Sequence, residues 1–324
     1  VTGVQTCALP IFTRRLVEGG FSADIRLDAG LFPDGNQTKA ETAILAYDFD
    51  RMQANLAEHI DQLKQTQSAR ERAESELRIA GQIQETFLPG PFAPAELGGR
   101  VQLQAAMKTA KQAGGDLFDY FALDDAHLFF AIGDVSGKGM PAAMFMSAAV
   151  VLLRSAAKLW RDPAEILRRV NDDLALRNES CTFVTLFAGI LDVRTGEVVF
   201  ANGGHNPPRL RNAAGAVAAV PTKTNMVVGA LEGQTYARET LALRPGDVLV
   251  LYTDGVTEAF NEADQLYGED RLDRRLGALP ADATAAEILR SVVADVAAFA
   301  GAREQSDDIT MLVLRSLPPA QITT

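Results

Sequence analysis

Four groups of aspartates stand at the ends of apolar, strand-like runs in this sequence, where an unused charge is costly. A single aspartate at a strand end is usually a turn or a helix cap. Carboxylates that come together at strand ends repel one another, and divalent cations remove that repulsion. Oxygen ligands without His or Cys favour magnesium or manganese over zinc. The groups are Asp116 and Asp119 in GGDLFDYF, Asp134 in FFAIGDVSGKGMPAAM, Asp254 in VLVLYTDGVTEA, and Asp307 with Asp308 in QSDDITMLVL.

No convincing nucleophilic side chain accompanies these aspartates. Cys181 in ESCTF precedes a predicted strand and has no adjacent base, so we expect it to be buried. His205 in GGHNPP is a candidate general acid, against the alternative that it satisfies backbone groups in a turn. Lys138 in GDVSGKG either attracts a substrate phosphate or lies in solvent. The glycines around Lys138 do not have the G-x-x-x-x-G-K-[ST] spacing of a nucleotide P-loop.

The aspartate blocks also carry a family resemblance. GGDLFDYF, IGDVSGKGMPAAM, LYTDGVTEAF and SDDITMLVL, in this order, resemble the signature of the metal-dependent protein phosphatase (PPM) family, closest to its SpoIIE/RsbU-type bacterial branch. AGQIQETFLP, FVTLFAGILD and NGGHNPPRL are similar to that branch as well. The resemblance spans Ala80 to Arg315. It implies an α+β fold, a sandwich of two antiparallel sheets flanked by helices.

The resemblance further implies a metal site. Asp134 would bridge two divalent cations, Mn²⁺ or Mg²⁺, with the backbone carbonyl of Val135 as a further ligand. Two such cations lower the pKa of a shared water, so that hydroxide attacks phosphorus in line without a covalent enzyme intermediate. The remaining implied roles are Asp116, Asp254 and Asp307 as carboxylate ligands, Asp308 beside the last ligand, His205 behind the ligands, and Asp119 as either an acceptor behind the ligands or a plain cap.

The implied activity is that of a protein serine/threonine phosphatase. Its implied partner is a phosphorylated protein of the anti-sigma antagonist type in a bacterial partner-switching pathway. One alternative is a nucleotidyl cyclase, which also uses two metal-binding aspartates but has no use for the paired Asp307 and Asp308. The other is a non-enzymatic scaffold whose globular part only binds a partner; a loss of metal binding would favour it.

The chain before the aspartate blocks reads as helical. Residues 30–38 contain Pro, Gly and Asn and predict a loop, and apolar residues spaced three or four apart after Glu41 predict a helix. Together, residues 12–57 resemble part of a HAMP signalling module, against the alternative of an ordinary surface helix pair. Residues 58–87 predict a linker helix with an imperfect heptad seam, compatible with a weak coiled coil and a homodimer.

Residues 88–317 form the predicted phosphatase-like domain, with short β-prone runs and helical stretches. Antiparallel hairpins dominate, because the turn Arg194 to Glu197 joins consecutive strands. The predicted strands are 101–107, 128–134, 182–193, 198–201, 248–252 and 309–315, and the predicted helices are 140–158, 163–176 and 285–300.

Bulk properties limit the partners. The chain has 324 residues, with 31 basic against 42 acidic side chains and a net charge of -11, which argues against nucleic acid or an anionic membrane surface as a partner. Its two cysteines have no paired spacing and predict a reducing, cytoplasmic location. No stretch reads as a membrane span in this fragment, although an anchor upstream is compatible with it. Val1 to Ile11 resembles a translated sequencing adapter, so we expect the native chain to continue upstream of Phe12.

Overall fold

A computed structural model describes residues 36–93 and 97–318. The chain forms two compact units, residues 1–69 and 70–324. One helix, α2 (Asn36–Glu85), runs without a break through the boundary at residue 57 between the predicted HAMP-like module and linker. The adapter-like segment, the first HAMP-like helix and most of the loop at 30–38 lie outside the described residues. The helix already includes residues 36–38, so the predicted loop was drawn too long.

The first part of the predicted heptad seam on α2 faces solvent, and its last residue, Gln84, is buried. Leu56 and Leu63 are both exposed. No finding tests the coiled coil or the homodimer, which stay predictions.

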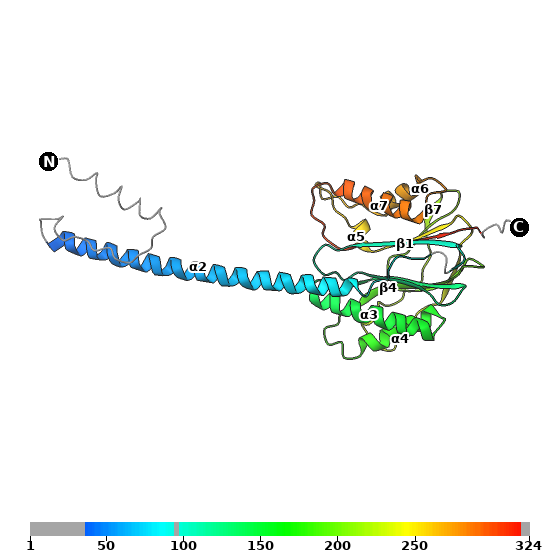
Figure 1. The fold of residues 1–324 in the computed structure, drawn as a ribbon, viewed down its shortest axis with the longest axis horizontal. Helices are drawn as coiled ribbons and strands as arrows, with labels where there is room; N and C mark the ends of the chain where they lie inside the picture. Colours follow the sequence, from blue (N-terminus) through cyan, green and yellow to red (C-terminus); the bar gives the residue numbers. More distant parts are fainter. Residues whose placement is uncertain (1–35, 94–96, 319–324) are drawn as a thin grey trace. The chain divides into compact units, whose positions relative to one another are not determined.

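Residues 97–318 form two antiparallel sheets, as the family resemblance implied (Figure 1). One sheet has the strand order β1-β10-β9-β6-β7 and the other β2-β3-β4-β5-β8. The strands are β1 (Val101–Lys108), β2 (Leu117–Ala122), β3 (His127–Val135), β4 (Val184–Asp192), β5 (Glu197–Gly203), β6 (Arg209–Arg211), β7 (Val217–Ala219), β8 (Glu239–Ala242), β9 (Val248–Tyr252) and β10 (Ile309–Ser316).

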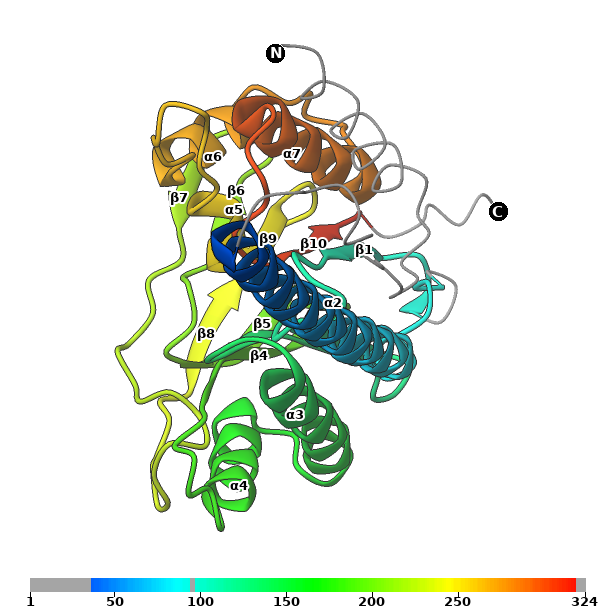
Figure 2. The same ribbon diagram turned by 90° about the vertical axis from the view of Figure 1, so that its left-hand side faces the viewer.

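Helices cover the outer face of each sheet, and the inner faces pack against each other (Figures 1 and 2). Phe130, Phe187 and Phe200 of one sheet lie in the same buried cluster as Leu251 and Leu312 of the other. The helices are α3 (Met140–Leu159) and α4 (Pro163–Ala175) on the β2-β3-β4-β5-β8 sheet, and α5 (Asp254–Thr257), α6 (Glu269–Gly277) and α7 (Ala285–Ala300) on the other.

The helices begin where the sequence offers caps. Asp162 accepts a hydrogen bond from the backbone N–H of Ala164 and starts α4. Thr284 and Glu287 form a reciprocal capping box at α7. Gly139, with φ of 79°, turns the chain from β3 into α3, a conformation that glycine adopts at little cost.

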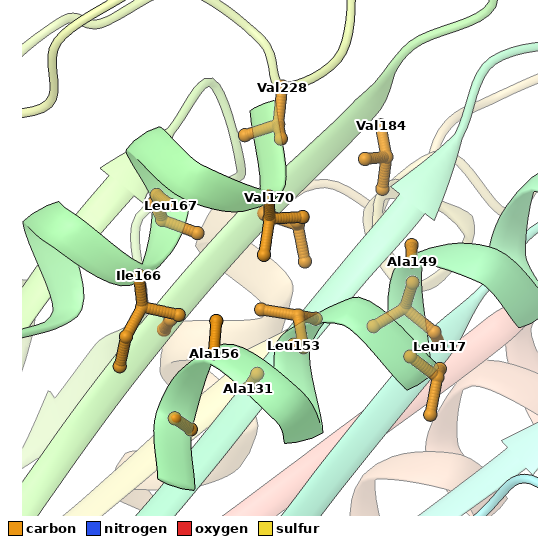
Figure 3. Close-up of a cluster of buried hydrophobic side chains, with 14 of the residues drawn as sticks. Leu117, Ala131, Ala149, Leu153, Ala156, Ile166, Leu167, Val170, Val184 and Val228 are labelled. Atoms are coloured by element: carbon orange, nitrogen blue, oxygen red, sulfur yellow. The ribbon is translucent and has the colours of Figure 1, made fainter. Parts of the chain in front are cut away.

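Helix α3 is buried along one face. Ala149, Leu153 and Ala156 pack with Val170 of α4 over the sheet (Figure 3). By length and composition, α3 is the single described helix apolar enough to cross a bilayer. The helix contains Arg154 and Lys158, so it is not a run of about 20 consecutive apolar residues, and its apolar face is in the core.

Candidate metal centre

The predicted ligands lie at neighbouring strand ends of both sheets. Asp116 directly precedes β2 and Asp134 lies near the end of β3. The register that pairs Leu117 with Gly133 brings Asp116 opposite Asp134. In the other sheet, Asp254 is the first residue of α5, separated from the end of β9 by Thr253. Asp307 and Asp308 directly precede β10, which is the strand beside β9.

Asp116 and Asp134 are held in an unfavourable environment for charge. Asp116 is 1% exposed, and burial together with the Asp134 charge raises its pKa well above the ordinary value. Its Oδ2 accepts a hydrogen bond of 2.8 Å from the Thr253 hydroxyl. Burial, followed by the charges of Asp254 and Asp307, raises the pKa of Asp134 to about 7.

Asp254 shares this environment. Burial raises its pKa, and the neighbouring carboxylates of Glu258 and Asp307 raise it further. Glu258 was not selected from the sequence. It follows Asp254 by one helical turn, a spacing that places the two side chains on the same helix face.

Asp307 and Asp308 play different parts. Asp307 Oδ2 accepts a hydrogen bond of 2.9 Å from Lys138 Nζ, which also donates to the Ser306 carbonyl. The Asp307 hydrogen bond raises the pKa of Lys138. Asp308 instead receives the backbone N–H groups of Ala110 and Gly115 at 2.8 and 2.9 Å, so it fixes the loop that leads to Asp116.

Gly115 keeps space open beside the predicted ligands. A Cβ at Gly115 would lie 2.9 Å from the Val135 carbonyl oxygen and 3.4 Å from Asp134 Oδ1. The same surface forms a small pocket lined by Asp134, Lys138, Asp307 and the glycines around them. Of the predicted ligands, Asp134 and Asp307 line this pocket, and the Val135 carbonyl borders Gly115, which also lines it.

The donor chemistry suits hard divalent cations. Burial and then the charges of neighbouring carboxylates raise the pKa values of Asp116, Asp134 and Asp254, and cations would relieve that repulsion. Within residues 36–93 and 97–318, no three Asp, Glu, His or Cys side chains converge tightly enough to enclose an ion as they stand. Asp116 and Asp307 are each hydrogen-bonded as they stand, to the Thr253 hydroxyl and to Lys138 Nζ.

Asp119 has neither of its two predicted roles. It is completely buried, and Arg154 of α3 donates two hydrogen bonds to its carboxylate, at 2.6 and 2.8 Å. Its other partner is the backbone N–H of Tyr120. Asp119 therefore joins β2 to α3 through an ion pair and contributes nothing to the acidic pocket.

His205 lies behind the strand that bears Asp134. Its Nδ1 is 2.9 Å from the Thr185 hydroxyl, and that hydroxyl is 3.4 Å from the Asp134 carbonyl oxygen. Asn202 bonds both the backbone N–H and the carbonyl of His205. Burial lowers the pKa of His205 to about 4, so the ring is neutral at pH 7. The side chain is also absent from the lining of the pocket that contains Asp134 and Asp307. This geometry supports the turn interpretation over the general acid.

The prediction that Cys181 is buried was wrong. It is exposed, with φ of 51°, in the turn before β4 rather than in the core. Asn178 organises this turn by bonding the carbonyls of Thr182 and Gly229, so the local chain direction leaves the thiol outside.

Sequence reasoning also missed Gln84. This buried side chain near the end of α2 donates to the Gly114 carbonyl at 2.6 Å and accepts from the Gly114 N–H at 3.2 Å. Close packing supports the contact, since a Cβ at Gly81 would lie 1.9 Å from the Gln112 carbonyl oxygen. A glutamine within the block AGQIQETFLP was the available signal, but its partner lies 30 residues away.

Comparisons with known proteins agree with this fold. Residues 124–317 match the family model of stage II sporulation protein E (SpoIIE). The chain is 30% identical over 266 residues to protein IcfG of Synechocystis, covering 74% of this chain and 41% of that protein. It is 29% identical over 188 residues to phosphoserine phosphatase RsbU of Bacillus subtilis, covering 58% and 55% respectively. The chain thus spans about half the length of these curated relatives.

Solved structures show the same architecture. The SiaA-PP2C domain of Pseudomonas aeruginosa has a TM-score of 0.64 and 24% identity, covering 76% of this chain and 98% of that one. The RsbU and RsbW domains of a Mycobacterium tuberculosis protein give a TM-score of 0.57 and 26% identity, covering 68% and 60%. Together with the family match over residues 124–317, these likenesses establish that the chain belongs to the SpoIIE family and has the PP2C-type fold.

Proposed function

We propose that this chain is a divalent-cation-dependent protein serine/threonine phosphatase acting in bacterial signal transduction. The observation that carries the proposal is the gathering of Asp116, Asp134, Asp254 and Asp307 at neighbouring ends of two sheets, where burial and neighbouring carboxylates raise the pKa values of the first three. Such an arrangement is destabilising unless cations bind there. The family membership supports the same reading, and residues 88–317 are proposed as the catalytic domain.

The proposed ligands are these four carboxylates with the Val135 carbonyl. Two Mn²⁺ or Mg²⁺ ions held there would supply Lewis acidity and an activated water for hydrolysis of the phosphate ester. Gly115 keeps the approach to Asp134 and the Val135 carbonyl free of side-chain atoms. Lys138, half-exposed at the rim, orients Asp307 and places a positive charge where a substrate phosphate would enter.

The proposed substrate is phosphoserine or phosphothreonine on a protein. RsbU and RsbP of Bacillus subtilis are named phosphoserine phosphatases, and each shows between 24% and 29% identity to this chain. A phosphorylated anti-sigma antagonist in a partner-switching pathway is the substrate we propose by extension. A cytoplasmic location follows from such a substrate.

Hydrolysis of p-nitrophenyl phosphate and of a phosphoserine peptide, with and without manganese, tests this function. Activity should require manganese and should fall by a factor of about 1,000 or more in Asp134→Asn, because a cation ligand is lost. The matched control is Asp125→Asn, which changes an exposed aspartate on the β2–β3 turn and should keep full activity. Manganese-independent activity, or an active Asp134→Asn protein, would refute the metal mechanism. Absence of both activity and metal binding would favour the scaffold alternative.

A further inference from the structure

A second pocket lies directly beside the acidic one. Its volume is about 140 Å³, and it is lined by the C-terminal half of α7, the residues after α5, and residues 303–307 before β10. Most of its wall is apolar. The apolar lining used below is Ala259, Phe260, Val293, Val296, Ala297 and Ala300.

The two pockets meet at Ser306 and Asp307, which line both. One side of Asp307 therefore faces the proposed phosphate site and the other faces an apolar hollow. A phosphorylated residue bound at the first pocket would place its chain neighbours at the second. This continuity identifies the occupant as a segment of the substrate itself.

The rim of the second pocket is held in place by Gln305. Gln305 Nε2 donates to the carbonyl oxygens of Lys108 and Asp307, both at 2.8 Å. Two carbonyl partners fix the orientation of the amide, because only its NH₂ group can donate. The Gln305 Oε1 atom is buried without a partner in the described part of the chain, so the amide holds the segment before β10 in place and does not face a ligand.

The charges at this rim are mixed but suit a phosphorylated segment. Lys108 is exposed and has no ion pair or hydrogen bond of its side chain among the described residues. Arg303 pairs with Asp264 at 3.0 Å, while Glu304 adds one acidic group. With Lys138 on the other side of Asp307, two lysines flank the path of an anionic peptide.

We propose that this pocket receives an aliphatic side chain next to the phosphorylated residue of the substrate. The inference rests on the proposed phosphatase function and deepens it. It assigns the substrate class as phosphoserine or phosphothreonine segments with a neighbouring Leu, Ile or Val. The apolar lining supplies the preference, since burying such a side chain is favourable.

The test is a phosphoserine peptide series in which leucine or glycine occupies each of the two positions on either side of the phosphoserine. With manganese, kcat/KM should be about tenfold higher for leucine than for glycine at one of these positions. Ala297→Phe, which fills the pocket from α7, should abolish that preference and leave p-nitrophenyl phosphate hydrolysis within twofold. The matched control Ala298→Phe lies one residue further on the exposed helix surface, outside the lining, and should keep the preference.

The outcomes distinguish a failure of the pocket assignment from a failure of the proposed phosphatase function. If p-nitrophenyl phosphate is hydrolysed but the unmodified protein prefers leucine at no position, the pocket assignment is wrong and the phosphatase assignment stands. The same holds if Ala297→Phe and Ala298→Phe behave alike. If no phosphate ester is hydrolysed with any metal, both proposals fall together.

Discussion

Asp116 and Asp119 lie three residues apart in one block, and both are almost fully buried, yet they differ in what faces them. Arg154 neutralises Asp119 through two hydrogen bonds. Asp116 faces Asp134, another carboxylate, and accepts a hydrogen bond from the neutral Thr253 hydroxyl. A buried carboxylate with a cationic partner is part of the architecture. A buried carboxylate opposite a second one indicates a binding site for a cation.

The largest expected effect separates these two aspartates by activity. Asp116→Asn should lower manganese-dependent hydrolysis of p-nitrophenyl phosphate by about 1,000-fold or more, because it removes a proposed ligand. Asp119→Asn should change the activity per folded molecule by less than about threefold, since its carboxylate does not reach the acidic pocket. Both variants should first be checked for folding by circular dichroism. Similar losses of activity in the two would contradict the assignment of Asp116 as a ligand and Asp119 as a structural residue.

The ion pair between Asp119 and Arg154 should affect the stability of the fold rather than the activity. Arg154→Met leaves the Asp119 carboxylate buried without a cation and should lower the free energy of unfolding by about 3 kcal/mol. Asp119→Asn should cost less, because the side chain of Arg154 is 38% exposed and can turn to water. Urea unfolding checks both values. The double variant Asp119→Leu with Arg154→Met should be more stable than Arg154→Met alone, and a further loss would contradict the ion-pair account.

His205 provides a third buried ionisable group, on the far side of the Asp134 strand. Its pKa is lowered to about 4 in the folded protein, against about 6.5 when unfolded. The unfolded chain therefore binds more protons between pH 6.5 and 4, and stability falls as the pH falls through this window. This group should contribute a loss of about 2 kcal/mol from pH 7 to pH 5. Urea unfolding of His205→Gln should show a shallower decline than the unmodified protein, and an equal slope would show that the ring is not buried in neutral form.

The smallest expected effect concerns the support behind Asp116. Gln84→Ala leaves the Gly114 N–H and carbonyl without their side-chain partner, which should loosen the turn that carries Asp116. We expect about tenfold lower activity at limiting manganese and a higher manganese concentration for half-maximal activity. The exposed neighbour Gln82 supplies the control, since Gln82→Ala should change neither quantity. Equal metal requirements in the two variants would rule out a positioning role for Gln84.

The strand ends that bear the aspartates were predicted from the sequence, because at each of them an apolar run stands next to glycine and other turn-forming residues. β9 and α7 have the predicted bounds for the same reason. Strands β6 and β7 were missed because three residues show no periodicity and pair only in the context of their neighbours. The partner of Asp119 lies 35 residues away, so no local pattern could separate an ion pair from a ligand or a cap.

The position of β10 has a consequence for synthesis of the chain. This strand lies between β1 and β9, so the first and last strands of the sandwich are hydrogen-bonded neighbours. Until residues 309–316 have left the ribosome, the first sheet lacks a central strand and Asp307 has no fixed position. Contacts between such distant segments form late in folding. A nascent or truncated chain that stops before β10 would therefore have neither a closed core nor a complete acidic pocket, so that hydrolysis would begin only with the finished domain.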